Sequence, residues 1–304
     1  MKKVNFLPSW VAQSQFAGYY MAKEKGIYEK YGMDVTIISG GYDKQVSEYL
    51  KEGKADFGTM YLTSAIKERA DSINLVNIGQ VFQQSGIMFV AKKESGIDRI
   101  EDFSGKKIAV WRTVLEEMTV GFLNKNHINA DVIRINEGVN IFLKNAVDIC
   151  VGMSYNEYNR LVNFGMNRDE LSVFCLKDFE MGFPEDGIYC MEETIQEDPV
   201  LCENFVKASM EGWEYAFSHR EETVQVLRKI QKQENISDNL THLTWMLDGV
   251  QQLIKPAGEK NVDEGELLKT DYEKAVKFLL DEKVIDMETE FNNFYRGFVK
   301  NGQR

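Results

Sequence analysis

The sequence predicts an α/β protein with two lobes around a cleft and a helical C-terminal tail. Through the first half of the chain, short runs rich in β-branched residues alternate with longer segments of helical periodicity. This pattern is typical of a parallel sheet with helices on its faces. A second series begins near Ile87, and from about Asp198 to Lys300 nearly every segment has helical periodicity. The 304 residues are enough for about two domains.

The first series contains four strand-like runs and three helical segments. The first helix is expected to end at Gly32, because glycine readily adopts the left-handed conformation of a helix C-terminus. Asp43 is expected to cap the helix that follows it. That helix would bury Val46, Tyr49 and Leu50, which share one face. The predicted strands are Val4–Leu7, Val35–Ile38, Phe57–Met60 and Leu75–Phe82, and the other helices are Phe16–Tyr31 and Leu62–Arg69.

The second series and the tail follow the same two periodicities. The expected strands are Ile87–Ala91, Ile108–Trp111, Val132–Ile135 and Val147–Met153; a short helix and turn covers Ile100–Gly105, and helices cover Glu116–Asn124 and Tyr155–Phe164. The expected tail helices are Leu201–Phe217, Glu221–Gln233, Leu240–Ile254, Tyr272–Leu280 and Glu290–Val299. In the last helix, Phe291, Phe294, Tyr295 and Phe298 form one apolar stripe, which indicates core packing.

Composition excludes several classes of function. With 36 Lys and Arg against 48 Asp and Glu, the net charge is −12, and a nucleic-acid binder needs a basic face. Four cysteines without a C-x-x-C pair argue against a disulfide framework, a zinc ribbon or a thioredoxin-like motif. Cys150, within a strand, is expected to be a small buried apolar residue. No metal site is expected: the acid-rich stretch 178–185 could bind a cation, but a solvated loop is the favoured interpretation.

Motifs for catalysis or for a membrane span are also lacking in the sequence. It contains no G-x-S-x-G, no P-loop and no G-x-G-x-x-G after a strand, so catalytic residues and a nucleotide cofactor are not expected. No apolar run approaches the roughly 18 residues of a membrane span. Met1 leads straight into a strand-like run, so either the protein is cytoplasmic or a leader has been removed.

Aromatic and polar residues follow the predicted strands, where ligands bind in open α/β sheets. Trp10 could be a core residue, but its place after a strand and before a polar turn favours a platform for stacking a planar ligand. Glu157 opens a helix after an apolar strand. Two interpretations of it stay open: a helix N-terminal acid that favours the dipole, or a carboxylate that accepts N–H groups of a ligand.

The segment Trp10–Val35, WVAQSQFAGYYMAKEKGIYEKYGMDV, resembles the opening of a family of ABC-transporter solute-binding proteins. This family includes the binders of thiamine-pyrimidine precursors, and the wider superfamily includes binders of nitrate, sulfonates and taurine. The similarity covers roughly residues 4–215. It continues in order through Gly53–Gly58, Val81–Gln84, Ser95–Ile97, Asp102–Lys107, Ile108–Trp111 and Tyr155–Glu157.

The resemblance implies a type II periplasmic-binding-protein fold whose lobes close on the ligand. Residues 1–88 and 185–304 would form lobe one, and residues 89–184 would form lobe two. Ala17 and Gly18 would let the first helix approach its sheet closely. Trp10 would stack on the ligand while Glu157 accepts its hydrogen bonds. The implied ligand-binding residues are Trp10, Gln13, Met60, Tyr61, Gln84, Trp111, Asn156 and Glu157.

This sequence departs from the family pattern at informative positions. Precursor binders usually have an Asn and a His after the Trp, where this chain has Gln13 and Phe16. The fungal branch contains enzymes that make the thiamine pyrimidine from pyridoxal phosphate and a histidine of their own. They use a Lys and a His four residues apart, aligned here with Met60 and Ser64, together with a cysteine-rich motif that this chain lacks. A Schiff base and a histidine donor are therefore not expected.

The expected function is an extracytoplasmic solute-binding protein, not an enzyme, that delivers a small heteroaromatic or amine-bearing ligand to an ABC permease. The ligand-sensing domain of a membrane receptor such as a histidine kinase is the alternative, and a pyrimidine-synthase-like enzyme is less favoured. The expected protein is a monomer without a cofactor. It would be periplasmic or a cell-surface lipoprotein whose leader is absent from this sequence, and a cytoplasmic location stays open.

Overall fold

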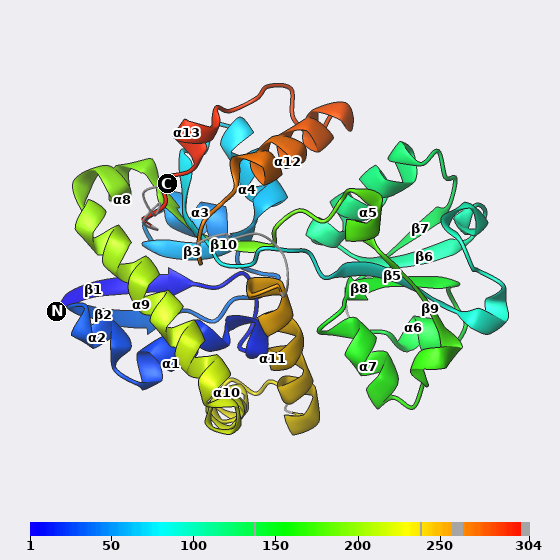
Figure 1. Ribbon diagram of the computed structural model, residues 1–304, viewed down its shortest axis with the longest axis horizontal. Helices are drawn as coiled ribbons and strands as arrows, with labels where there is room; N and C mark the ends of the chain where they lie inside the picture. The colour runs from blue at the N-terminus through cyan, green and yellow to red at the C-terminus, as the bar shows by residue number, and fades with distance from the viewer. Residues whose placement is uncertain (137, 238, 257–263, 299–304) are drawn as a thin grey trace. The chain divides into compact units, whose positions relative to one another are not determined.

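The computed structural model describes residues 1–136, 138–237, 239–256 and 264–298 (Figure 1). The chain divides into two compact units. Unit 1 comprises Met1–Gln83 and Phe183–Arg304, and unit 2 comprises Gln84–Gly182. The predicted lobes divide after residues 88 and 184. Each unit contains one five-stranded sheet among the described residues.

Unit 1 is built on a mixed sheet with the strand order β2-β1-β3-β10-β4. Its strands are β1 (Lys2–Leu7), β2 (Met33–Ile37), β3 (Phe57–Tyr61), β4 (Leu75–Gln80) and β10 (Asp186–Met191). β1 is parallel to β2 and β3, whereas β10 is antiparallel to both β3 and β4. An antiparallel strand begins at the edge where its neighbours end. Asp186, the first residue of β10, therefore lies opposite Tyr61, the last residue of β3.

Unit 2 repeats this arrangement with the strand order β7-β6-β8-β5-β9. Its strands are β5 (Ile87–Lys92), β6 (Lys107–Trp111), β7 (Asp131–Ile135), β8 (Ile149–Met153) and β9 (Leu171–Cys175). β6 is parallel to β7 and β8, and β5 is antiparallel to β8 and β9. In both sheets the antiparallel fourth strand, β10 or β5, is the first strand after the chain enters that unit. Both sheets are therefore mixed, and the expectation of parallel sheets was wrong. The strands β9 and β10 were not predicted from the sequence.

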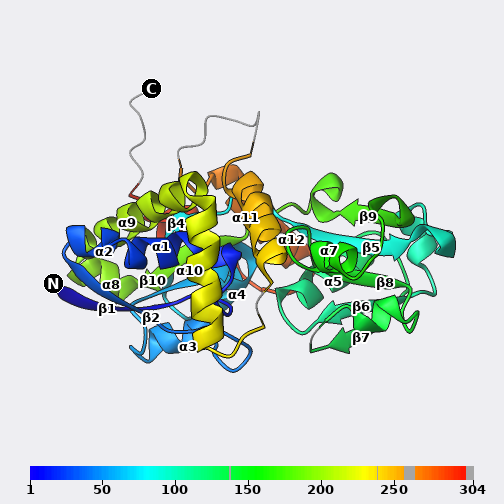
Figure 2. The same cartoon turned by 90° about the horizontal axis from the view of Figure 1, so that it is seen from below.

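Helices cover both faces of the unit 1 sheet, as Figure 2 shows for α1 and α9 on one side and α3 on the other. Phe57 of β3 stacks on Phe205 of α9 with ring centroids 4.2 Å apart, whereas Gly58 contacts Val46 of α3. Successive residues of a strand point to opposite faces, so α9 and α3 lie on opposite sides. The helices of unit 1 are α1 (Ala17–Glu24), α2 (Ile27–Lys30), α3 (Val46–Lys51), α4 (Leu62–Ala70), α8 (Glu192–Glu197), α9 (Pro199–Ser218), α10 (Arg220–Gln233), α11 (Leu240–Ile254), α12 (Lys269–Asp281) and α13 (Phe291–Phe294).

The described residues of unit 2 form three α-helices. They are α5 (Val114–Lys125), α6 (Asn140–Leu143) and α7 (Glu157–Asn163), with 3-10 turns at Lys93–Ser95, Ile100–Phe103, Arg168–Glu170 and Leu176–Phe179. Cys150 is buried in β8, as the sequence predicts. Among the described residues, no helix is long and apolar enough to cross a membrane.

Gly18 of α1 lies against helix α9. A Cβ atom at Gly18 would lie 2.3 Å from the Trp213 ring of α9, and one at Gly212 would lie 2.2 Å from the Gly18 carbonyl oxygen. The expectation that Ala17 and Gly18 let the first helix approach its sheet closely was therefore wrong for Gly18. Its missing side chain makes room for α9, whose Trp213 is fully buried.

Other local expectations were also wrong. The segment 16–31 is two helices and not one, because Gly26 adopts a left-handed φ of 66° between α1 and α2. The residue before α3 is Gln45, so Asp43 does not cap this helix. Tyr49, which was expected to be buried, is half-buried. The C-terminal helix stops at Phe294, since Tyr295 is extended and forms a β-bridge with Asn77 of β4. Residue 299, the end of that predicted helix, lies outside the described residues.

Candidate ligand-binding site

The carboxyl edge of the unit 1 sheet has an aromatic corner made of Trp10 and Tyr42. Their ring centroids lie 4.4 Å apart with the planes at 86°. The two loops that hold these rings are in close contact, since a Cβ at Gly40 would lie 2.3 Å from the Pro8 carbonyl oxygen. Trp10 is half-buried and Tyr42 is 50% exposed. A planar group could therefore stack at this corner.

Beside this corner, Asp186 is a buried carboxylate held by two side chains. Gln15 donates from Nε2 to Oδ2 at 2.7 Å, and Ser9 donates from Oγ to Oδ1 at 3.3 Å. The Ser9 backbone N–H donates to Thr59 Oγ1 at 2.9 Å, and Gln13 Nε2 donates to Gln15 Oε1 at 2.8 Å. These bonds link the loop after β1, the end of β3 and the start of β10 into one polar network.

Burial dominates the acid–base behaviour of Asp186. It raises the pKa of this carboxyl to about 6, while the hydrogen bonds from Gln15 and Ser9 act in the opposite direction. Among the described residues, no Lys, Arg or His forms an ion pair with it, and no cation contributes to its pKa shift. A buried carboxylate without a cation is unusual and often marks a functional site.

The other residues expected in lobe one lie along the same edge of the sheet. Met60 and Tyr61 are the last residues of β3; Met60 is buried and Tyr61 is half-buried. Gln13 is half-buried and precedes the 3-10 turn Ser14–Phe16 that leads into α1. Trp10, Gln13, Met60 and Tyr61 are thus all at the carboxyl edge of this sheet.

In unit 2, Glu157 opens α7 and folds back over the end of β8. Its Oε2 accepts the Met153 N–H at 2.8 Å, and its Oε1 accepts from Asn156 Nδ2 at 2.9 Å. Glycine at position 152 makes this possible, because a Cβ there would lie 2.3 Å from the Glu157 Cβ. Burial raises the pKa of the Glu157 carboxyl against the opposing effects of backbone hydrogen bonds and of Arg160. Glu157 is therefore a buried acid in the first turn of α7, and both interpretations of it stay open.

Trp111 and Asn156 lie at the same edge of the unit 2 sheet as Glu157. Trp111 ends β6, which is parallel to β8, so the carboxyl ends of these two strands share one edge. β5 begins at this edge, where Ile87 pairs with Met153, and Gln84 lies three residues before β5. Each unit thus gathers its share of the expected residues at one sheet edge.

Three further candidates were not predicted from the sequence: Asp186, Tyr42 and Gln15. Asp186 was missed because the strand that it opens was missed. Tyr42 follows Gly40 and Gly41 in the loop after β2, and an aromatic residue after Gly-Gly beyond a predicted strand is a signal that could have identified it. The acid-rich stretch 178–185 was assigned to a solvated loop, which is wrong at its end, since Glu185 is fully buried. Among the described residues, no group of three potential ligands could hold a metal ion.

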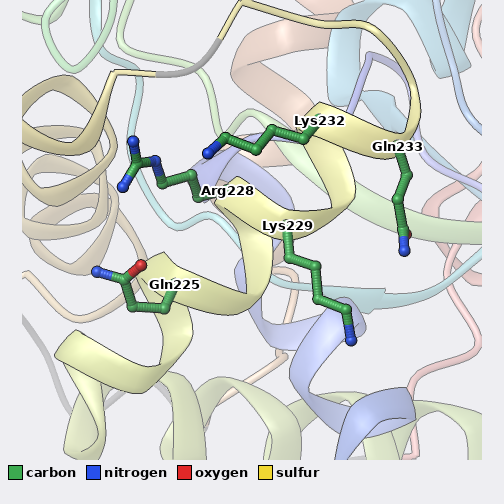
Figure 3. Close-up of a pocket in the computed structure, with 5 residues that line it drawn as sticks. All are labelled: Gln225, Arg228, Lys229, Lys232 and Gln233. Carbon is green, nitrogen blue, oxygen red and sulfur yellow. The ribbon is translucent and has the colours of Figure 1, made fainter.

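A separate groove of about 440 Å³ lies on α10 in unit 1 (Figure 3). It is lined by Gln225, Arg228, Lys229, Lys232 and Gln233. In Figure 3 the side chains of Arg228 and Lys232 extend to the same side of the helix. No aromatic side chain lines this groove, so it does not suit the stacked planar ligand expected from the sequence.

A protein-family model described as NMT1/THI5 like matches residues 13–223, more than half of the chain. The protein belongs to this family. The matched region begins after Trp10, and it includes Tyr42, Asp186, Trp111 and Glu157. A riboflavin-binding protein and several synthases of 4-amino-5-hydroxymethyl-2-methylpyrimidine phosphate are among its relatives.

Two curated relatives illustrate this range. The riboflavin-binding protein RibY of Chloroflexus aurantiacus is 23% identical over 222 residues, which are 70% of this chain and 62% of RibY. The 4-amino-5-hydroxymethyl-2-methylpyrimidine phosphate synthase of Aspergillus parasiticus is 30% identical over 109 residues, which are 35% of this chain and 31% of the synthase. The matches therefore span less than two thirds of each of these relatives.

A solved structure establishes the fold. The periplasmic aliphatic sulphonate binding protein SsuA of Escherichia coli superimposes with a TM-score of 0.73 at 13% identity, covering 100% of this chain and 95% of SsuA. The protein therefore has the periplasmic-binding-protein fold that the sequence predicts.

Proposed function

We propose that the protein is an extracytoplasmic solute-binding protein that delivers a small heteroaromatic or amine-bearing ligand to an ABC permease. The observation that carries this proposal is that each unit has an aromatic residue and a buried carboxylate at one sheet edge. Unit 1 has Trp10 and Asp186, and unit 2 has Trp111 and Glu157. Ligands of open α/β sheets bind beyond the carboxyl ends of strands.

In the proposed mechanism, Trp10 of unit 1 stacks on the ring of the ligand, and Glu157 of unit 2 accepts hydrogen bonds from N–H groups of the ligand. The other residues proposed to bind the ligand are Gln13, Met60, Tyr61, Gln84, Trp111 and Asn156. The permease would then recognise the ligand-bound protein, which is proposed to be a monomer.

Names of relatives support the chemical class of the ligand. RibY is a riboflavin-binding protein, and several other relatives are synthases of an aminopyrimidine phosphate. Flavins and aminopyrimidines are both planar heterocycles that carry N–H donors. Both fit a site made of indole rings and carboxylates.

Those synthases also raise a second candidate function, catalysis on pyridoxal phosphate. The residues aligned with the synthase Lys and His are Met60 at the end of β3 and Ser64 in the first turn of α4. A thioether cannot form a Schiff base, and a serine hydroxyl cannot donate the atoms of an imidazole ring. We therefore propose binding without turnover.

The test is a thermal-shift screen with aminopyrimidines, flavins, sulfonates and polyamines, followed by calorimetric titration of each hit. Aromatic stacking contributes ~0.5–1.5 kcal/mol beyond area burial, and a hydrogen bond to a charged group contributes ~1.5–3 kcal/mol. Trp10→Ala and Glu157→Gln should therefore each weaken binding about tenfold or more, since ~1.4 kcal/mol is a factor of ten. Lys3→Ala, at an exposed position of β1, is the control and should bind as the wild type does. Wild-type affinity in both site variants would refute this assignment.

A further inference from the structure

Unit 1 contains a polar network whose central residue is not among the residues proposed to contact the ligand. It centres on Asp186, whose two carboxylate oxygens each accept one side-chain hydrogen bond from within unit 1. An ionised carboxylate has about four acceptor positions, so this group can accept further hydrogen bonds. The two donors, Ser9 and Gln15, also fix its orientation.

The charge of Asp186 is not balanced within the described part of the protein. A carboxylate that is 1% exposed normally has a cationic partner, because an isolated buried charge is destabilising. Here both bonding partners are neutral: an amide and a hydroxyl. A donor or positive charge supplied by a bound molecule would complete this arrangement.

The aromatic corner is linked to this carboxylate through Ser9. Ser9, which donates to Asp186, is the residue before Trp10, and Trp10 meets Tyr42 with their ring planes nearly perpendicular. A planar ligand that stacks on one ring would therefore be nearly perpendicular to the other.

We infer that Asp186 and Tyr42 determine ligand specificity: Asp186 accepts N–H groups from the edge of a planar amino-heterocycle, and Tyr42 closes the corner around its ring. This inference rests on the proposed solute-binding function and specifies the ligand class. An anionic solute such as an alkanesulfonate is rejected at this edge, because its charge has the same sign as that of Asp186. The protein thus differs in selectivity from SsuA, the aliphatic sulphonate binding protein with which it shares its fold.

The test is calorimetric titration with three probes: 4-amino-5-hydroxymethyl-2-methylpyrimidine, riboflavin and methanesulfonate. The wild type is expected to bind at least one of the two heterocycles and not methanesulfonate. Asp186→Asn should weaken heterocycle binding tenfold or more, and Tyr42→Ala should weaken it several-fold. Asp34→Asn is the matched control, since it removes one negative charge from an exposed position of the same unit, and it should change affinity less than twofold.

Because Tyr42 is half exposed, Tyr42→Ala keeps the test informative even if Asp186→Asn folds poorly. Heterocycle binding that is unchanged in both variants overturns the role of these residues and leaves the solute-binding function standing. Binding of methanesulfonate in preference to both heterocycles overturns the ligand class alone. Failure of all three probes, and of every solute in the wider screen, contradicts the proposed function and this inference together.

Discussion

Gln15 donates a hydrogen bond from Nε2 to Oδ2 of Asp186 across 2.7 Å, although 171 residues separate them in the sequence. The bond joins the turn that leads into α1 to the strand with which the chain re-enters unit 1. Because β10 lies between β3 and β4, this late strand brings its first residue to the edge formed by the earliest loops. The candidate site of unit 1 is thus assembled from segments that are far apart in the sequence.

Asp186 should make the stability of the protein depend on pH. Its folded pKa is raised to about 6 by burial, so between the ordinary Asp pKa and pH 6 the folded state binds a proton that the unfolded state has released. The stability contributed by this group is complete below pH ~4 and is lost as the pH rises through about 6. At ~1.36 kcal/mol per pKa unit, the loss is at most about 3 kcal/mol.

Urea unfolding of the wild type and of Asp186→Asn at several pH values between 4 and 7 checks this. Asparagine can keep the bond from Gln15 through its oxygen and donate to Ser9, but it has no charge to bury. The free energy of unfolding of the wild type should fall relative to that of the variant as the pH rises. Parallel curves for the two proteins over this range would show that the carboxyl titrates normally.

Gly18→Ala should destabilise unit 1 through a clash between α1 and α9. The new Cβ would lie 2.3 Å from the Trp213 ring, and Trp213 is fully buried. Overpacking of a core typically costs about 1–3 kcal/mol. The free energy of unfolding measures this cost, and the double variant Gly18→Ala/Trp213→Phe should recover part of it. Additive effects of the two substitutions would mean that the two residues do not interact.

Gly152→Ala should act on the site through Glu157. A Cβ at position 152 would lie 2.3 Å from Cβ and 2.7 Å from Cγ of Glu157, so the carboxylate must move away from the Met153 N–H. The affinity for the heterocycle that binds should fall about as much as in Glu157→Gln, by about tenfold, since the same ligand hydrogen bonds are lost. Titration of both variants checks this, and wild-type affinity in Gly152→Ala would argue against the described position of Glu157.

Incubation with pyridoxal phosphate and iron should give no pyrimidine product. Met60 and Ser64 stand at the positions aligned with the synthase Lys and His, so neither the Schiff base nor the histidine donor is available. Mass spectrometry of the reaction mixture is the measurement, with a thiamine-pyrimidine synthase as the positive control. Detection of the aminopyrimidine above the level of a protein-free blank would overturn this prediction.

Sequence patterns predict most elements of this fold because each element has a local periodicity. The buried strand β8 and the amphipathic helix α11 are examples, and the predicted range for α11 has the same bounds as the helix itself. Local patterns fail where a distant segment decides the conformation. Tyr295 continues an apolar helical stripe, yet its backbone is extended because it pairs with Asn77 of the edge strand β4.

The candidate site shows the same limit. Trp10 and Glu157 can be selected from the sequence because each follows a strand that is itself predictable. Asp186 cannot, since its position depends on the insertion of β10 between two strands more than a hundred residues earlier in the chain. The sequence singles out Gly18 as a site of close packing, but the contact is with Trp213 of α9 and not with the sheet. This partner is 195 residues away in the sequence, so only the fold reveals it.

The measurement that tests the central claim most directly is equilibrium dialysis of the purified protein against 4-amino-5-hydroxymethyl-2-methylpyrimidine and, separately, riboflavin, with mass spectrometry of the recovered ligand. Reversible solute binding predicts saturation at one molecule per chain for at least one of the two compounds, and the ligand should be recovered chemically unchanged. Binding should be weakened about tenfold or more in the Trp10→Ala protein. No saturable binding of either compound, or recovery of a converted product, would contradict the account.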